Sequence, residues 1–287
     1  MPRLSNWRTT IEWATLSGSY ATLPRVQGFT LREGTGKVVS RALGASVGVN
    51  DTILLTGGAP SLTGLSFELR HVASGGILPY LYRTGGVLTP IKFRINNPNG
   101  SWELFGAYNS QNILNWAPDN TGTITVSADF IGTSLYTTSC ATASAEGTGA
   151  IYQWYDGQVG INSASFEVIQ AAYTMNHNIQ PLFSLDGATT TFPQAIHTDT
   201  LPTIEGSLTA RLSTTSFTEP GLLKRSVFNI VIKATRAGST TTSYQWLFYT
   251  ASMNDVDVIN HGGPSDDPMT FNIPFIAMSN NFTFSVV

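Results

Sequence analysis

The chain has 287 residues, of which 41% are hydrophobic and 11% are charged, and its formal net charge is -3. This apolar content can form a folded core, and the low charge with many aromatic residues is unlike a disordered chain. Lysines and arginines are scattered, so the basic patch that grips nucleic acid is missing, and the single cysteine, Cys140, excludes a disulfide within the chain and a cysteine-based zinc site.

The N-terminal residues lack the apolar segment of a secretory signal, and no run of about 18 apolar residues occurs in the chain. We therefore expect no export signal and no membrane insertion. The low charge suits strands whose outer faces carry Thr, Ser and Asn, or faces that meet other subunits in place of water.

Apolar and polar residues alternate with a period of two through the first half, the pattern of half-buried strands. The dipeptide Asn99-Gly100 between two such runs predicts a tight hairpin. A Gly-rich stretch over residues 33–60 interrupts the alternation, and we expect it to be a long loop arm that becomes ordered on a partner. The expected strands cover residues 9–16, 23–33, 64–72, 90–97, 101–108 and 120–132.

The second half shows the same alternation, and residues 74–86 and 218–228 are the best candidates for short helices. The fold class is therefore all-β, with two or three short helices at most. The small polar stretch at 138–150 is the expected linker between a first β unit, 1–137, and a second, 151–287. The expected strands cover residues 161–175, 204–213, 228–238, 243–252, 269–278 and 281–287.

A weak internal repeat supports two tandem units. Residues 102–132 and 246–277 both begin with an aromatic strand, pass through a polar connection with an Asp-containing turn, and close on Phe-Ile followed by a small residue. A chance similarity between two Thr-rich hairpins is the alternative explanation.

Patterns that could indicate chemistry are weak. Residues 44–48 match G-x-S-x-G around Ser46, but the nucleophile elbow needs a strand before it and a helix after it, and no helix is expected here. The histidines lack metal-binding spacing. We expect no catalytic residue, no metal site and no cofactor. An acidic cluster is a solvated turn or a lining that repels a polyanion, and it comprises Asp255, Asp257, Asp266 and Asp267.

The order of signals in the second half resembles the tail tube proteins of long-tailed bacteriophages. In that family a strand leads to an asparagine-rich turn, a loop follows, and a strand of the pattern "sGslt" comes next, before an acidic turn and a closing strand. The matching residues here are Asn176, Asn178, Gly206, Ser207 and Leu208. The resemblance covers residues 150–287 well and residues 1–135 loosely.

The resemblance implies β-sandwich or half-barrel units whose sheets join those of neighbouring copies in a ring, with rings stacked into a tube for DNA. Two units in one chain would let three chains form a pseudo-sixfold ring, and a single unit would need six chains. The acidic cluster would line the lumen. The arm would contact the next subunit through Val38, Val39, Arg41, Leu43, Ile53, Leu54 and Leu55, and an inter-subunit loop would include Asn176, His177, Asn178, Phe192 and His197.

The implied partners are copies of this chain and other tail proteins of the baseplate, tape-measure or terminator kind, with DNA passing transiently. The implied location is the virion tail, assembled in the host cytoplasm. The alternatives are a capsid jelly roll, a baseplate or fibre domain, a hydrolase using Ser46, or a carbohydrate-binding β-sandwich. The last would use exposed tryptophans from the set Trp102, Trp116, Trp154 and Trp246.

Overall fold

A computed structural model describes residues 9–23, 25–34, 36–43, 49–56, 58–72, 76–97, 100–117, 122–139, 149–162, 164–165, 168–183, 192–211, 227–235, 243–253, 270–278 and 281–287. These residues form an almost entirely β structure, as the period-two alternation predicts, with two short 3-10 helices, η2 and η3. None of the helices in this described part has the length and hydropathy needed to span a bilayer.

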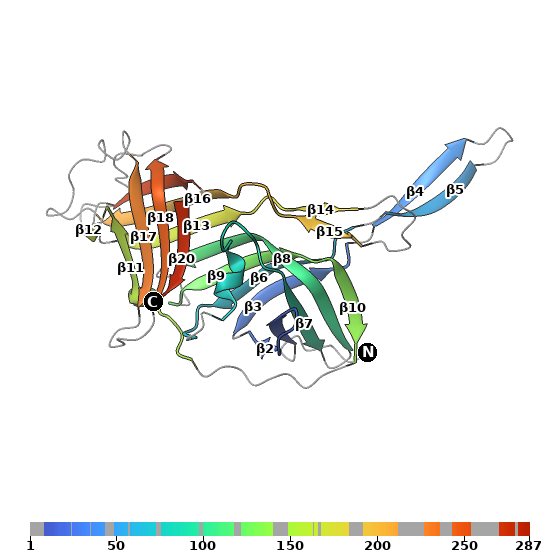
Figure 1. Ribbon diagram of the computed structural model, residues 1–287, viewed down its shortest axis with the longest axis horizontal. Coiled ribbons are helices and arrows are strands. Elements are labelled where there is room, and N and C mark those ends of the chain that lie inside the picture. The colour runs from blue at the N-terminus through green and yellow to red at the C-terminus, as the bar shows by residue number, and fades with distance from the viewer. Residues whose placement is uncertain are drawn as a thin grey trace, which may run out of the picture.

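In the first half of the chain, the described residues form ten strands and η2. Figure 1 shows their arrangement. Their bounds are β1 Thr10–Thr15, β2 Ala21–Thr22, β3 Val26–Arg32, β4 Gly36–Leu43, β5 Val49–Thr56, β6 Ser61–Glu68, η2 Leu78–Leu81, β7 Ile91–Asn97, β8 Gly100–Trp116, β9 Thr125–Ile131 and β10 Ser134–Thr138.

In the second half, the described residues form η3 and ten further strands. Their bounds are η3 Trp154–Asp156, β11 Gly157–Ile161, β12 Ala164–Ser165, β13 Val168–Asn176, β14 Gln180–Leu182, β15 Ala195–His197, β16 Thr203–Arg211, β17 Phe228–Thr235, β18 Ser243–Met253, β19 Thr270–Ala277 and β20 Phe282–Val286.

The arm is a β-hairpin and not the long loop that the glycine content predicted. Strands β4 and β5 pair antiparallel from Gly36↔Thr56 to Leu43↔Val49, and they project from one end of the molecule (Figure 1). The apolar runs in this segment have the β-branched composition of strands. Pairing the two strands satisfies their backbone groups locally, which an irregular loop could not do.

The long strand β8 passes from one group of strands to another at Gly106. Its N-terminal part pairs with β7 and β10, whereas its C-terminal part pairs with β9 and β13. Gly106 has a φ of 58°, and a Cβ there would collide with the Thr133 hydroxyl. Glycine is therefore required for the turn of backbone that moves the strand between its two sets of partners.

Strand β18 makes the same passage in the second half. Its N-terminal part pairs with β17 and β20, and its last residues pair with β19. The passage occurs at Thr250, whose φ is 52°, an uncommon value for a β-branched residue. The Asn281 side chain donates a hydrogen bond of 2.7 Å to the Thr250 hydroxyl, which helps to hold the conformation.

The register of pairing is the same in the two halves. Ile95 of β7 faces Trp102 of β8, as Ile232 of β17 faces Trp246 of β18, and both ladders contain a bulge further along. The remaining strands follow suit: β1 and β2 correspond to β11 and β12, and β3, β6 and β9 correspond to β13, β16 and β19. Each half also has a separate hairpin, β4–β5 or β14–β15. Strands β1–β10 and β11–β20 thus share one pairing pattern.

The two halves are joined through a continuous sheet. Strand β13 pairs with the C-terminal part of β8, from Ala171↔Trp116 to Asn176↔Gln111. One apolar cluster contains buried side chains of both halves, among them Phe130 and Phe248. In the first half, the strand equivalent to β13 is β3, and among the described strands β3 pairs with β6 alone. Among the described strands, one side of β3 is therefore an open sheet edge.

Candidate self-assembly surfaces

The residues considered for catalysis or metal binding lie partly outside the described part of the chain. Ser46 and the four acidic residues of the predicted lumen cluster lie outside the described residues. The His71 Nδ1 atom lies 3.1 Å from the Tyr152 hydroxyl, and the exposed His197 lies 3.9 Å from Asp199. In the described ranges, no three His, Cys, Asp or Glu side chains are grouped as metal ligands would be.

The four candidate tryptophans are not exposed together. Trp116 and Trp246 are buried, and Trp102 is partly buried against the apolar cluster. Of the four, Trp154 alone has a large exposed fraction, 40%.

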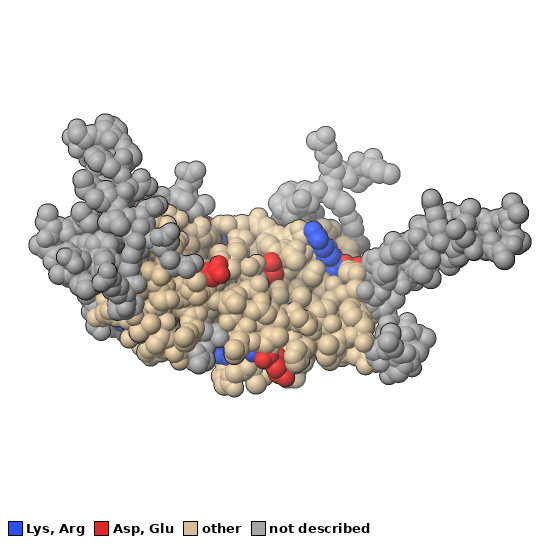
Figure 2. Space-filling view, turned by 90° about the horizontal axis from the view of Figure 1, so that it is seen from above, with Lys and Arg blue, Asp and Glu red and all other residues tan. Residues whose placement is uncertain are grey.

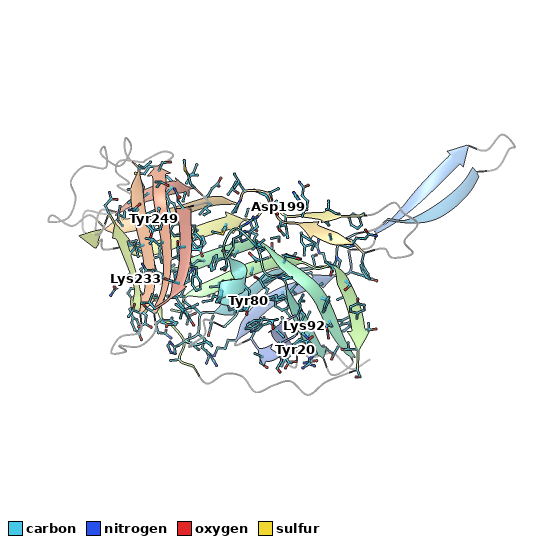
Figure 3. The ribbon with its side chains drawn as sticks, in the orientation of Figure 1. Tyr20, Tyr80, Lys92, Asp199, Lys233 and Tyr249 are labelled. Atoms are coloured by element: carbon cyan, nitrogen blue, oxygen red, sulfur yellow. The ribbon has the colours of Figure 1, made fainter. Side chains whose placement is uncertain are left out.

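A buried ion pair escaped the sequence analysis. The Glu12 carboxylate is fully buried, and it accepts hydrogen bonds of 2.8 Å from the Arg94 guanidinium and 2.7 Å from the Asn96 amide. The centroid of the Tyr20 ring lies 4.0 Å from the Arg94 guanidinium carbon and 4.9 Å from the Lys92 Nζ atom. Figure 3 labels Tyr20 and Lys92, which lie close together. Burial raises the pKa of the Tyr20 hydroxyl, with a further contribution from Glu103. The pairing satisfies charges that would otherwise be costly to bury.

Charge is sparse on the one face of the described surface that Figure 2 shows, where a few charged side chains interrupt an otherwise uncharged area.

His177 lies at the junction between the halves. Its side chain is fully buried, and its Nε2 atom lies 2.9 Å from the carbonyl oxygen of Leu81 at the end of η2. The pKa of His177 is lowered to about 4. Burial is the main cause, the hydrogen bond to Leu81 opposes the shift, and the nearby Arg83 adds to it. His177 is therefore neutral near pH 7 and joins two halves of the same chain. Its predicted contact with another copy stays a prediction, as do those of Phe192 and the exposed Asn176, Asn178 and His197.

The segment after β6 docks on the second half. We call residues 76–90 the β6–β7 connector. Tyr82 in this connector is buried, and its hydroxyl lies 2.5 Å from the Tyr173 hydroxyl and accepts a hydrogen bond of 2.7 Å from the Trp246 indole. The next residue, Arg83, donates to the carbonyl oxygens of His177 and Thr200 at 3.2 and 2.6 Å.

The hairpin of the second half covers the first half in return. Ile179 and Ile196, next to β14 and within β15, form a small apolar cluster with Leu88, and Tyr108 of β8 and Ile131 of β9 pack against it. Figure 1 shows the β14–β15 hairpin reaching from the second half over the first. The junction therefore has three parts: a strand pairing, an inserted connector and a covering hairpin.

The corresponding features at the two ends of the chain are incomplete. The edge of β3 has no neighbour among the described strands, and the β4–β5 hairpin projects beyond the body of the molecule (Figure 1). Ile276 occupies the position in β19 that Ile131 has in β9, since each pairs with the corresponding residue of β18 or β8. Ile276 is 39% exposed and Met278 is 61% exposed. In the first half, by contrast, the equivalent Ile131 packs against the small apolar cluster that contains Ile179 and Ile196.

No family model matches this chain, and no curated protein matches its sequence.

Proposed function

We propose that the chain is a structural, non-enzymatic subunit that assembles head to tail with copies of itself, and that it forms stacked rings like those of a phage tail tube. The single observation that carries the proposal is that one junction between the halves is complete, whereas among the described residues the open side of β3, the projecting β4–β5 hairpin and the exposed Ile276 and Met278 stand at positions equivalent to parts of that junction. The repeated strand pattern supports the division into two tandem units.

The strand edges support this proposal first. An open sheet edge exposes unpaired N–H and C=O groups and is a site for pairing with another chain. Within the chain, β13 is covered by the C-terminal part of β8. By the equivalence of the halves, β3 of the next copy would pair with the residues that follow β18 in this copy. The described residues of β18 end at Met253, so the residues that would pair with β3 lie outside the described part of the chain.

The hairpin supports the same direction of assembly. Because the β14–β15 hairpin covers Tyr108 and Ile131 within the chain, the β4–β5 hairpin of the next copy would cover Ile276 and Met278. Exposed apolar side chains that are grouped together mark interaction surfaces. The predicted contacts of the arm residues, Val38 to Leu55, stay part of this proposal.

Both contacts join one end of a copy to the other end of the next. Such a heterologous contact forms a ring when the rotation between copies closes. Three copies would supply six units, the number that the resemblance to tail tube proteins implies. Rings stacked in a virion tail, next to other tail proteins, would then form a conduit for DNA. A surface with few cations would not retain the phosphates of the passing DNA.

The test is the assembly state of the purified full-length chain. Light scattering and negative-stain electron microscopy should show rings of three chains, or tubes of such rings. A monodisperse monomer at every concentration, also in the presence of the tail proteins of its own particle, contradicts the proposal.

A further inference from the structure

The first half contains an open cavity of about 560 Å³. Its lining includes Phe29 and Leu31 of β3, Trp102 of β8 and side chains of β10, together with the polar Thr9, Glu33 and Asn97. Aromatic, aliphatic and polar side chains thus line a space large enough for side chains of another segment.

The second half has the same site in a filled state. Tyr82 of the β6–β7 connector occupies it, with its ring centroid 5.2 Å from that of Phe282 and 4.9 Å from that of Phe284. The tyrosine is 3% exposed and is held by hydroxyl contacts to Tyr173 and Trp246. Burial raises the pKa of the Tyr82 hydroxyl to about 12, so it remains a neutral hydrogen-bonding group.

The residues around Tyr82 correspond by register to residues that line the cavity. Trp102 pairs with Ile95 as Trp246 pairs with Ile232. Strand β10 pairs with β8 in the same register as β20 pairs with β18, so their side chains occupy equivalent positions. The row Leu31–Leu62–Phe130 corresponds to the row Tyr173–Gly206–Phe275. The equivalent pairs are Trp102 and Trp246, Leu135 and Phe282, Thr137 and Phe284, and Leu31 and Tyr173.

We propose that this cavity receives the segment between β16 and β17 of a second copy of the chain. This inference rests on the proposed function, because it names the part of the neighbouring copy that completes the first half. The β16–β17 segment is the counterpart of the β6–β7 connector, since β16 and β17 correspond to β6 and β7. Residues 212–226 of this segment lie outside the described residues.

The sequence of the segment suits the cavity. Counted back from β17, the position equivalent to Tyr82 is Glu219, and counted forward from β16 it is Arg225. The large apolar side chains between these two positions are Leu222 and Leu223. A cation follows them, Lys224, as Arg83 follows Tyr82. In the filled site this cation donates to backbone carbonyl oxygens of the receiving half.

The donor has to be another copy. Strands β16 and β17 lie at one end of the chain and β10, which lines the cavity, lies at the other (Figure 1). Within the chain, the β6–β7 connector of the first half inserts into the second half, which follows it along the sheet. Repeating this step places the second half's connector in the first half of the following copy.

Thiol crosslinking between two populations of chains tests the insertion. Cys140→Ser first removes the only native cysteine. One population then carries Leu135→Cys in the cavity, and the other carries Leu222→Cys or Leu223→Cys. After mixing under assembly conditions, a short bifunctional thiol reagent should join the two populations about tenfold more than in a control mixture, because docking raises the local thiol concentration. The control acceptor is Tyr155→Cys, which is 63% exposed and lies in η3 of the second half.

The outcomes separate this inference from the proposed function. Rings or tubes that form without crosslinking above the control overturn the inference and leave the proposed function standing. Failure of any assembly contradicts both. A chain with Ser5→Cys and Leu135→Cys that links within itself while assembly proceeds assigns the cavity to the chain's own N-terminal segment, and this result also overturns the inference.

Discussion

Tyr82 and Trp246 come from opposite halves of the chain, and the Trp246 indole donates a hydrogen bond of 2.7 Å to the Tyr82 hydroxyl. Both side chains are buried, and Tyr173 lies 2.5 Å from the same hydroxyl. The aromatic insertion of the first half into the second is therefore a polar as well as an apolar contact. It fixes how the two halves are placed relative to one another.

Removing the Tyr82 hydroxyl should destabilise the chain. Tyr82→Phe leaves the buried Trp246 indole N–H without its acceptor, which should lower the free energy of unfolding by about 1–3 kcal/mol. Urea titration followed by tryptophan fluorescence measures this change. Tyr136→Phe is the matched control, since Tyr136 is 52% exposed and should show no shift. Equal midpoints for the two variants would mean that the contact at Tyr82 adds nothing.

Stability should fall in acid because of His177. Its pKa is lowered to about 4 in the folded chain, against about 6.5 when unfolded, so only the unfolded chain binds this proton between those values. The contribution is present above pH 6.5 and is lost progressively down to about pH 4, by about 3 kcal/mol in total. Unfolding titrations between pH 7 and 4 should show a shallower loss for His177→Gln than for His197→Gln. Parallel curves would contradict the assignment.

Gly106→Ala should disrupt the passage of β8 between its two sets of strands. The positive φ disfavours a side chain, and the new Cβ would collide with Thr133, so a loss of at least about 1–2 kcal/mol is expected. Gly28→Ala is the control, because an added Cβ there meets nothing within 4 Å. Thermal unfolding followed by circular dichroism compares the two. A stable Gly106→Ala chain would show that the strand can turn without glycine.

The Glu12–Arg94 pair should matter more than the pair between the exposed Arg25 and Glu68. Glu12→Gln leaves the largely buried Arg94 without its counter-charge, which should cost about 3 kcal/mol. Arg25→Gln should change stability by less than about 1 kcal/mol, since the Arg25 side chain is 62% exposed. Chemical denaturation gives both values. A loss for Arg25→Gln as large as that for Glu12→Gln would refute the ranking.

The β4–β5 hairpin should be required for assembly but not for folding. Replacing residues 38–55 by a short Gly-Ser turn removes a hairpin that forms a separate two-stranded sheet, so the circular dichroism spectrum should keep its β character. Rings and tubes should be lost in electron micrographs. Ile276→Asp should weaken assembly from the other side of the same contact, whereas Val87→Asp, at a site 62% exposed, should not. Normal tubes from the shortened chain would refute the role of the arm.

Much of the strand content could be predicted from local patterns. Residues 90–97 alternate between apolar and charged side chains, and β7 occupies Ile91–Asn97. The Asn99-Gly100 turn was predicted between β7 and β8, and these strands pair next to it. The repeat between residues 102–132 and 246–277 is also visible in the letters. A strand's own alternation reports which of its faces is buried, and this property depends on the residues of that strand alone.

Which strands pair, and what fills the space between them, was decided only by the folded chain. Nothing local in β13 indicates that β8 is its neighbour, and the short η2 region gave no sign that Tyr82 enters the second half. The burial of Glu12 likewise depends on Arg94 and Asn96, which lie far from it in sequence. These relationships depend on contacts between distant segments, whose free energy exists only once both segments are in place. Residue patterns thus determined an all-β chain, whereas long-range packing created the junction between its two halves.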